Sequence, residues 1–378
     1  MTGRERLLAV LEGHEPDRVP FSPNIGQWFG AHQSRGTLPQ ELADCSDEVD
    51  AMLKLGCDVF SRRCGPFARV RYGPEILITR DPQQEVGLNT PTEGPVTTTV
   101  ETPRGVLRAV SQFQPASHTS YEREYFWKDF EREYAALKYW IEHTDYCFDA
   151  AAYAKAAARV GESGIVIVAG QQAPIKRIFN LAGPENGILW IMEHENELME
   201  LMAIHTEKAA AFAREVAESD ALAMMSMDNL CSLFYTPNFF RKYCRDYYRR
   251  IGEILHANGK YWFSHACGRV AALKDQVAEV ELDGLEGSPH APLGDVDLRV
   301  FRDTIPYRRH VVWGGMTCHE QEIVKDAPAR LEAHVKGLFG PMRPFHRFVF
   351  SSSCNTSVRT PFENLLLFRD NCWKHGRN

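Results

Sequence analysis

The sequence predicts an α/β protein built on a (β/α)8 TIM barrel, with a small antiparallel β insertion between the second and third strands. Two observations predict this fold. Short, nearly continuous apolar runs alternate with longer helical patterns, as in parallel sheets that helices cover on both faces. The connection between the second and third runs is too long for one crossover, and it carries the polar–apolar alternation that is typical of antiparallel strands.

The predicted barrel strands share a β-rich, apolar composition and are followed in most cases by a helical pattern. In chain order they are Arg18–Ser22, Cys57–Ser61, Gly164–Ala169, Ala221–Met227, Lys260–His265, Leu282–Gly287, His310–Gly314 and Arg347–Ser353. Apolar residues at helical spacing predict long helices over Asn186–Ser219, Pro237–Asn258 and Ala327–Phe339.

The long second connection contains the predicted insertion. Glu75–Arg80 and Pro95–Val110 alternate polar and apolar residues between glycines and prolines, and Trp127–Tyr139 returns to a helical pattern. We therefore expect one barrel domain over residues 1–378, with a β-rich insertion at 67–125 within it.

Composition narrows the class of protein. The chain has 43 Lys and Arg against 50 Asp and Glu, and this net charge of −7 argues against a nucleic-acid or anionic-membrane binder. The polar N-terminus has no apolar signal core, and no apolar run reaches membrane-spanning length, so we expect a cytoplasmic protein. Ten scattered Cys without a Cys-x-x-Cys indicate thiols or metal ligands and not a zinc ribbon.

Active sites of such barrels lie at the carboxyl ends of the strands. Two carboxyl groups there, Asp228 and Glu286, are candidate catalytic residues that donate or position a proton, although a helix N-cap or a loop ion pair would also explain Asp228. The candidate substrate-binding residues are Asn24, Arg62, Gln171, Asn229 and Tyr235. For two of them another explanation is open, because Arg62 could form an exposed pair with Arg63 and Tyr235 could pack within a helix.

His265-Ala266-Cys267, at the end of the fifth predicted strand, offers an imidazole and a thiolate from a single turn. Such nitrogen and sulfur ligands suit Zn²⁺ and argue against Mg²⁺ or Ca²⁺. Cys354 ends the last strand and would be a third ligand, which leaves the open fourth position of a catalytic zinc site, or one filled by Glu286. A buried Cys beside a hydrogen-bonded His would explain the motif without a metal, and Cys318-His319 is a rival ligand pair.

Four segments resemble a known family. RERLLAVLEGHEPDRVPFSPN (Arg4–Asn24) and SMDNLCSLFYTPNFFRKY (Ser226–Tyr243) resemble the uroporphyrinogen decarboxylase superfamily. HACGRVAALKDQVAEVELDGLEG (His265–Gly287) and SSSCNTSVRTPFENLLLF (Ser351–Phe368) resemble its zinc methyltransferase branch, which includes methylcobamide:coenzyme M methyltransferases and corrinoid-linked O-demethylase components. The resemblance implies a barrel with zinc on His265, Cys267 and Cys354.

The resemblance also implies a function, namely methyl transfer between a small methylated substrate and a corrinoid (cobalamin). The substrate would be a methyl ether, such as a methoxylated aromatic, or a thiol. A separate corrinoid protein would supply the cofactor in trans, because the chain has no Asp-x-His-x-x-Gly signature. A homodimer is the default assembly.

Two other functions stay open at this point. One is a decarboxylase acting on a carboxylated substrate, although Ser22–Ala31 (SPNIGQWFGA) lacks the arginines of the decarboxylases' Arg-Gln-Ala-Gly-Arg element. The other is a non-catalytic barrel protein.

Overall fold

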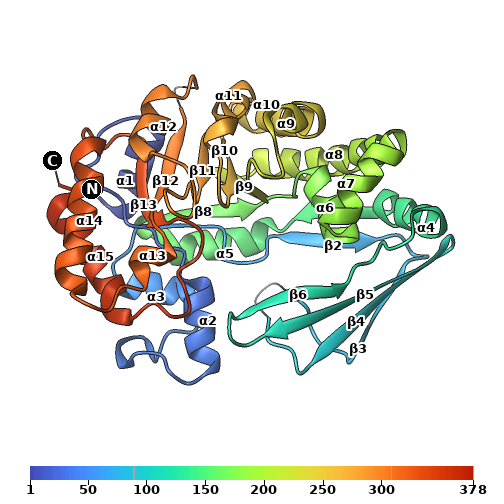
Figure 1. The fold of residues 1–378 in the computed structure, drawn as a ribbon, viewed down its shortest axis with the longest axis horizontal. Coiled ribbons are helices and arrows are strands. Elements are labelled where there is room, and N and C mark those ends of the chain that lie inside the picture. Colours follow the sequence, from blue (N-terminus) through green and yellow to red (C-terminus); the bar gives the residue numbers. More distant parts are fainter. Residues whose placement is uncertain (88–89, 308, 378) are drawn as a thin grey trace. The chain divides into compact units, whose positions relative to one another are not determined.

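The structure is a computed structural model that describes residues 1–87, 90–307 and 309–377. The chain forms two compact units, whose elements are labelled in Figure 1. The first, called the barrel unit here, comprises Met1–Phe67, Asp149–Gly170 and Val216–Asn378. The second, called the insertion unit, comprises Ala68–Phe148 and Gln171–Glu215.

The barrel unit is built on a curled sheet of seven parallel strands whose spatial order follows their order along the chain (Figure 1). The strands are β1 (Val59–Ser61), β8 (Gly164–Ala169), β9 (Ala223–Leu230), β10 (Tyr261–Ala266), β11 (Gly284–Glu286), β12 (Val311–Met316) and β13 (Phe348–Ser352). Each lies within two residues of a predicted apolar run at its start, and β8 has the predicted bounds. The predicted fold class is confirmed.

The first predicted strand, Arg18–Ser22, is the one that does not join this sheet as a full strand, and it forms a single parallel bridge, from Phe21 to Phe350. Phe350 donates its N–H to the carbonyl of Pro20 at 2.9 Å, and on the other side Asp58 donates to the carbonyl of Phe21 at 2.8 Å. The segment thus joins β13 to the start of β1. It is not a full strand, because Pro20 has no N–H and Phe21 donates its own to the Asp58 carboxylate at 2.9 Å.

Helices follow most of the strands of the barrel unit. They are α1 (Gly3–Glu12), α2 (Gly26–Ser34), α3 (Glu48–Lys54), α5 (Ala150–Val160), α9 (Pro237–Tyr243), α10 (Arg245–His256), α11 (Lys274–Glu279), α12 (Leu298–Thr304), α13 (Cys318–Gln321), α14 (Ala327–Met342) and α15 (Phe362–His375). Alternate strand residues such as Phe263, Met225 and Trp313 fill the barrel core, and Leu7 and Val10 of α1 pack into the same cluster. The core therefore fixes which strand residues face inward.

The insertion unit contains both antiparallel sheets. One pairs β2 (Ala68–Tyr72) with β7 (Thr144–Phe148), and the other has the order β3-β4-β5-β6. The remaining elements are β3 (Leu77–Asp81), β4 (Pro95–Thr102), β5 (Gly105–Gln114), β6 (Thr119–Glu124), α4 (Phe130–Glu142), α6 (Pro174–Ala182), α7 (Pro184–Glu193) and α8 (Glu195–Ala217). Its strands β2 to β6 lie within the predicted insertion at 67–125, and the unit also takes in helices from the next connection.

Two of the long predicted helices are wrong, because each is divided into two helices in the structure. The stretch Asn186–Ser219 is divided between α7 and α8 at His194, and Pro237–Asn258 is divided between α9 and α10 at Cys244. No helix of the described residues is both long and apolar enough to cross a membrane.

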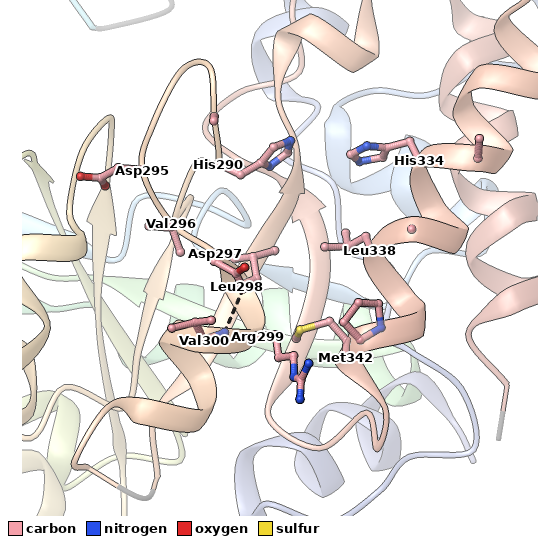
Figure 2. A pocket seen from close by; sticks show the side chains of 14 residues that line it. His290, Asp295, Val296, Asp297, Leu298, Arg299, Val300, His334, Leu338 and Met342 are labelled. Carbon is pink, nitrogen blue, oxygen red and sulfur yellow. Dashed lines mark hydrogen bonds between the residues drawn. The ribbon is translucent and has the colours of Figure 1, made fainter.

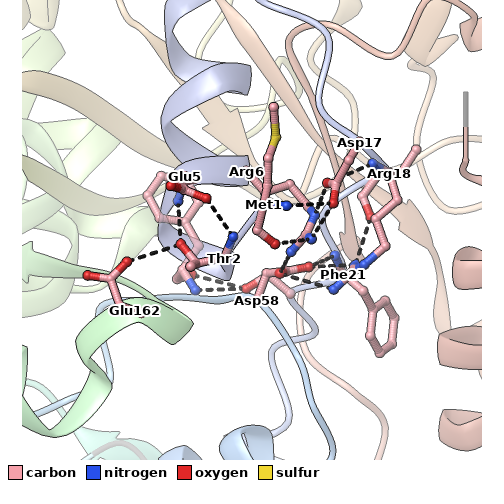
Figure 3. A network of polar contacts seen from close by, with 12 residues as sticks. Met1, Thr2, Glu5, Arg6, Asp17, Arg18, Phe21, Asp58 and Glu162 are labelled. Atoms are coloured by element: carbon pink, nitrogen blue, oxygen red, sulfur yellow. Dashed lines mark hydrogen bonds and ion pairs between the residues drawn. The ribbon is translucent and has the colours of Figure 1, made fainter.

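A buried ion-pair network anchors the N-terminus of the barrel unit (Figure 3). Asp58, just before β1, accepts from the guanidinium of Arg6 on α1 at 2.5 Å and from that of Arg18 at 2.8 Å. Arg6 also binds Asp17 at 2.7 Å. Because Arg6 and Asp58 are both buried, their charges depend on these partners for compensation.

We predict that Asp58→Asn lowers the free energy of unfolding by about 3 kcal/mol, the lower end of the range for breaking a buried pair, since Asp17 still binds Arg6. Urea unfolding followed by circular dichroism measures this loss. The matched control is Asp44→Asn, which removes an exposed pair with Lys54 and should leave the free energy of unfolding almost unchanged. Equal, small losses in both variants would contradict the anchoring role.

Candidate functional site

The ends of two strands of the barrel unit, β10 and β13, bring His265, Cys267 and Cys354 together. His265 is the fifth residue of β10 and shares the inward-facing side of that strand with the core residue Phe263. Cys267 follows β10, and Cys354 lies two residues beyond the end of β13. One ligand atom of each lies within 4.8 Å of the others. The cluster lies at the carboxyl ends of the parallel strands, where barrel enzymes have their active sites.

The contacts within this cluster are close. The Sγ atoms of Cys267 and Cys354 are 3.7 Å apart, and Cys354 Sγ is 3.7 Å from Nε2 of His265. His265 is buried, Cys354 is half-buried and Cys267 is exposed. The three donors thus face one point, and one side of that point is accessible.

Gly287 allows this approach. It has a φ of +108°, in the region that favours glycine, and it lies beside the residues that precede both cysteines. A Cβ at this position would be 2.2 Å from the carbonyl oxygen of Ala266 and 2.9 Å from that of Ser353. A side chain at position 287 would therefore force apart the backbone segments that carry Cys267 and Cys354.

Glu286 lies behind the imidazole. The register of β10 and β11 sets it opposite His265, whose Nδ1 donates a short hydrogen bond to Oε2 of Glu286. Burial alone would lower the pKa of His265, but the adjacent carboxylate raises it to about 9. Burial would raise the pKa of Glu286, yet the charges of His265 and Arg62 lower it. Nε2 of His265 is left to face the two sulfur atoms.

The two thiols differ in acidity because they are hydrogen-bonded to each other. A hydrogen bond from Cys354, together with one from His265, lowers the pKa of Cys267 to about 4. The same contact and burial raise the pKa of Cys354. Two sulfur atoms this close cannot both ionise easily without a cation, and that cation would favour both thiolates.

This donor set fits zinc. Two sulfurs and one imidazole nitrogen are the ligands that Zn²⁺ prefers, and three protein ligands leave the fourth position that catalytic zinc sites keep open. A carboxylate bound to the far nitrogen of a metal-ligating His is a recurrent feature that orients the ring. Glu286 takes that position, where its Oε2 is engaged by His265. The sequence predicts Glu286 as a fourth ligand or a proton donor, and in the structure it is the hydrogen-bond partner of His265.

Asn24 and Arg62 line a small cavity together with Glu286, Trp313 and Met225. This cavity is called the mouth of the site here. Asn24 donates from Nδ2 to the carbonyl oxygen of Cys354 at 2.9 Å. Its Oδ1 is buried and has no hydrogen-bond partner among the described residues. Burial lowers the pKa of Arg62, while Glu286 favours its charged form. The mouth therefore presents one free acceptor and one partly enclosed cation.

Asp228 lies on the other face of the sheet. Met225 and Met227 of β9 pack against the barrel core, so the alternate residues Ser226 and Asp228 face the helices. The carboxylate is fully buried and accepts from Ser226 at 2.6 Å and, through a short hydrogen bond, from Tyr248 on α10. This position favours a structural role for Asp228 over the proton transfer that the sequence predicts.

The other predicted residues have different surroundings. Tyr235 is buried and donates to the backbone carbonyl of Asp228 at 3.3 Å. Asn229 is exposed in a left-handed conformation with φ 52°, and Gln171 is the first residue of the insertion unit's second segment. Cys318 and His319, the rival ligand pair, are both exposed on α13.

A second group was missed altogether. His290, Glu320 and His334 also hold their ligand atoms within 4.8 Å of one another. They come from a loop and two helices, are separated by 30 and 14 positions in the chain, and form no recognisable spacing. The only sequence signal nearby was Cys318-His319, which precedes Glu320.

Comparison with known proteins identifies the family of the chain. The family model described as uroporphyrinogen decarboxylase (URO-D) matches residues 123–375, about two thirds of the chain. The chain belongs to the uroporphyrinogen decarboxylase family. Among solved structures, a methyltransferase from Methanosarcina mazei has a TM-score of 0.62 and 14% identity over 99% of each chain, which shows a shared fold. No curated protein sequence matches the chain.

We predict that Tyr248→Phe lowers the free energy of unfolding by about 1.5–3 kcal/mol, because the buried Asp228 carboxylate loses a charged hydrogen bond. Urea unfolding measures the loss. The control is Tyr121→Phe, whose exposed hydroxyl donates to Gln112 at 3.4 Å and should matter by less than about 0.5 kcal/mol. A Tyr248→Phe variant with native stability would be evidence against the structural role of Asp228.

Proposed function

We propose that the chain is a zinc-dependent methyltransferase that moves a methyl group between a small methylated substrate and a corrinoid carried by a separate protein. The observation that carries the proposal is the His265, Cys267 and Cys354 cluster, with Glu286 bound to the far side of the imidazole. The fold shared with the solved methyltransferase supports the same activity class.

The proposed chemistry places two demands on the site. Zinc held there would act as a Lewis acid. The corrinoid of the partner protein would accept or donate the methyl group. When an ether is demethylated, the methyl group leaves without its bonding electron pair, so the oxygen needs a positive charge or a proton. Glu286 would keep His265 in the tautomer whose Nε2 faces the sulfurs, and thereby hold the ligand set in one orientation.

The mouth residues suggest what the substrate carries. The buried Oδ1 of Asn24 would accept a hydrogen bond from a substrate hydroxyl or thiol. Arg62 would attract an anionic group, since its partly enclosed cation faces the same cavity. We therefore favour a methylated compound with one acidic or phenolic group, and a methoxylated aromatic fits that description.

A porphyrinogen-type decarboxylase is less well supported. A substrate with several carboxylates requires several cations, and among the described residues that line the mouth cavity Arg62 is the one cation. The cysteine pair would also have no role in that reaction, whereas it has one in zinc binding.

The metal is tested first by stoichiometry. Cys267→Ser and Cys354→Ser should each lower the bound zinc by about one ion per chain, because either change removes one of three ligands. Glu286→Gln should keep the ion but weaken its binding about 10–100-fold, as for other residues that hydrogen-bond a metal ligand. Elemental analysis and competition with a chelating dye measure both effects.

The control for the zinc measurement is Cys318→Ser, which removes an exposed thiol outside the cluster. It should keep the native zinc content. If the two cluster variants fold and retain as much zinc as the Cys318→Ser control, then the proposed centre is wrong.

The activity is tested by methyl transfer with a purified corrinoid protein and panels of methoxylated aromatics and of thiols. We expect one panel to change the absorption spectrum of the corrinoid. Cys267→Ser should abolish this change. The rate of methyl transfer should fall by more than the roughly 10–100-fold expected when a metal ligand loses its hydrogen-bond partner. A zinc-loaded chain that leaves every corrinoid partner unchanged would overturn the proposed reaction and leave the metal centre standing.

A further inference from the structure

His290, Glu320 and His334 meet outside the first cluster, although all three belong to the barrel unit. His290 lies on the loop that follows β11, Glu320 on α13 and His334 on α14. Nε2 of His290 is 3.1 Å from Oε1 of Glu320, and the two imidazole rings have centroids 5.6 Å apart. Figure 2 shows the rings of His290 and His334 pointing toward each other at one end of a cleft.

Local hydrogen bonds orient two of these side chains. Oε2 of Glu320 accepts from the N–H of Thr317 at 2.8 Å and from its hydroxyl at 2.5 Å, so Oε1 is the oxygen that faces His290. Nε2 of His334 is 2.7 Å from the carbonyl oxygen of Gly315. Because a carbonyl oxygen only accepts, this nitrogen carries the proton, and the lone pair of a neutral ring is on Nδ1.

The His334 contact has the form found around metal ions, where a ligating imidazole donates its other N–H to a carbonyl or carboxylate. The second observation concerns the other imidazole, that of His290. Its Nδ1 is buried and has no hydrogen-bond partner within the described part of the chain. Buried polar atoms of that kind are uncommon and call for an explanation, and a bound ion that reorients the ring supplies one.

The cluster opens onto space that a ligand can use. His290 and His334 line a cleft of about 730 Å³, whose walls include Val296, Leu338 and Met342 (Figure 2). Three protein ligands at its end would leave the remaining coordination positions facing this cleft. That is the arrangement of metal sites that bind a small molecule, as opposed to closed structural sites.

The chemistry of the donors selects the ion. Two imidazoles and one carboxylate form the ligand set of His₂Glu zinc sites and of related divalent transition-metal sites, whereas Mg²⁺ and Ca²⁺ prefer all-oxygen cages. Two ligands on one zinc ion are at most about 4 Å apart, twice the usual bond length. Ligand atoms that already lie within 4.8 Å need only small rotations to reach that separation.

We propose that His290, Glu320 and His334 form a second metal site, for a divalent transition ion of the zinc class, that is separate from the His265, Cys267 and Cys354 centre. The competing explanation is a polar contact in which His290 only pairs with Glu320 and so secures the N-terminus of α13. The two accounts differ in whether His334 and a metal ion matter.

The test uses the full chain with Cys267→Ser and Cys354→Ser, which removes the first centre. This double variant should still bind about one Co²⁺ or Zn²⁺ per chain. Its Co²⁺ form should show weak visible bands without thiolate charge-transfer absorption, because no sulfur ligand is left. Adding His334→Ala should weaken binding by more than about 100-fold, a larger effect than loss of a ligand's hydrogen-bond partner. Adding His319→Ala, an exposed neighbour of Glu320, should leave it unchanged.

If the double variant does not fold, a second measurement takes its place. Titration of the unmodified chain with Co²⁺ should then show two classes of ion, one with sulfur charge-transfer absorption and one without, and His334→Ala should remove only the second. If the folded variants bind no ion beyond the first centre, or if His334→Ala changes nothing, the second site is refuted. Loss of the sulfur-ligated class alone would instead overturn the first centre.

Discussion

The contact between Nδ1 of His265 and the carboxylate of Glu286 is the interaction on which the site depends. It needs two neighbouring parallel strands in one register, His265 opposite Glu286, with both side chains facing into the barrel. It sets the tautomer of the imidazole, and thereby which nitrogen faces Cys267 and Cys354. Burial alone would disfavour the charged forms of His265 and Glu286. The pairing of the two charges offsets that cost.

The rest of the barrel unit supports that register. Phe263 and Met225 fill the core below the site, so the strands cannot rotate without exposing apolar surface. Gly287 lets the backbones at Ala266 and Ser353 approach closely enough to bring the cysteines together. On the helix-facing side, the buried Asp228 carboxylate ties β9 to α10 through Tyr248. Polar groups on both faces of the sheet thus specify one alignment of the strand ends.

Much of the fold was predictable from the sequence because apolar runs identify buried parallel strands directly. Gly164–Ala169 was placed without error, and the antiparallel insertion was recognised from alternation between glycines and prolines. Arg18–Ser22 was overestimated as a strand, because the pattern does not reveal that the Asp58 side chain takes the N–H of Phe21. The breaks at His194 and Cys244 leave the helical period intact on either side, so periodicity alone joins the segments.

The site was predictable only in part. His265, Cys267 and Cys354 stood out because their residue types and strand-end positions suit zinc, and the family resemblance selected the same three. The inward or outward direction of a strand-end carboxylate depends on register, which is why Asp228 and Glu286 seemed equivalent in sequence. The group of His290, Glu320 and His334 depends on the packing of α13 and α14 against the end of β12, which leaves no local signature.

Zinc K-edge X-ray absorption of the His334→Ala variant, loaded with one equivalent of Zn²⁺, identifies the atoms that bind the ion. We expect two sulfur scatterers at about 2.3 Å and a histidine nitrogen at about 2.0–2.1 Å. In Glu286→Gln the same ligands should appear with weaker affinity. A first shell made only of nitrogen and oxygen in the folded variant would contradict the proposed centre.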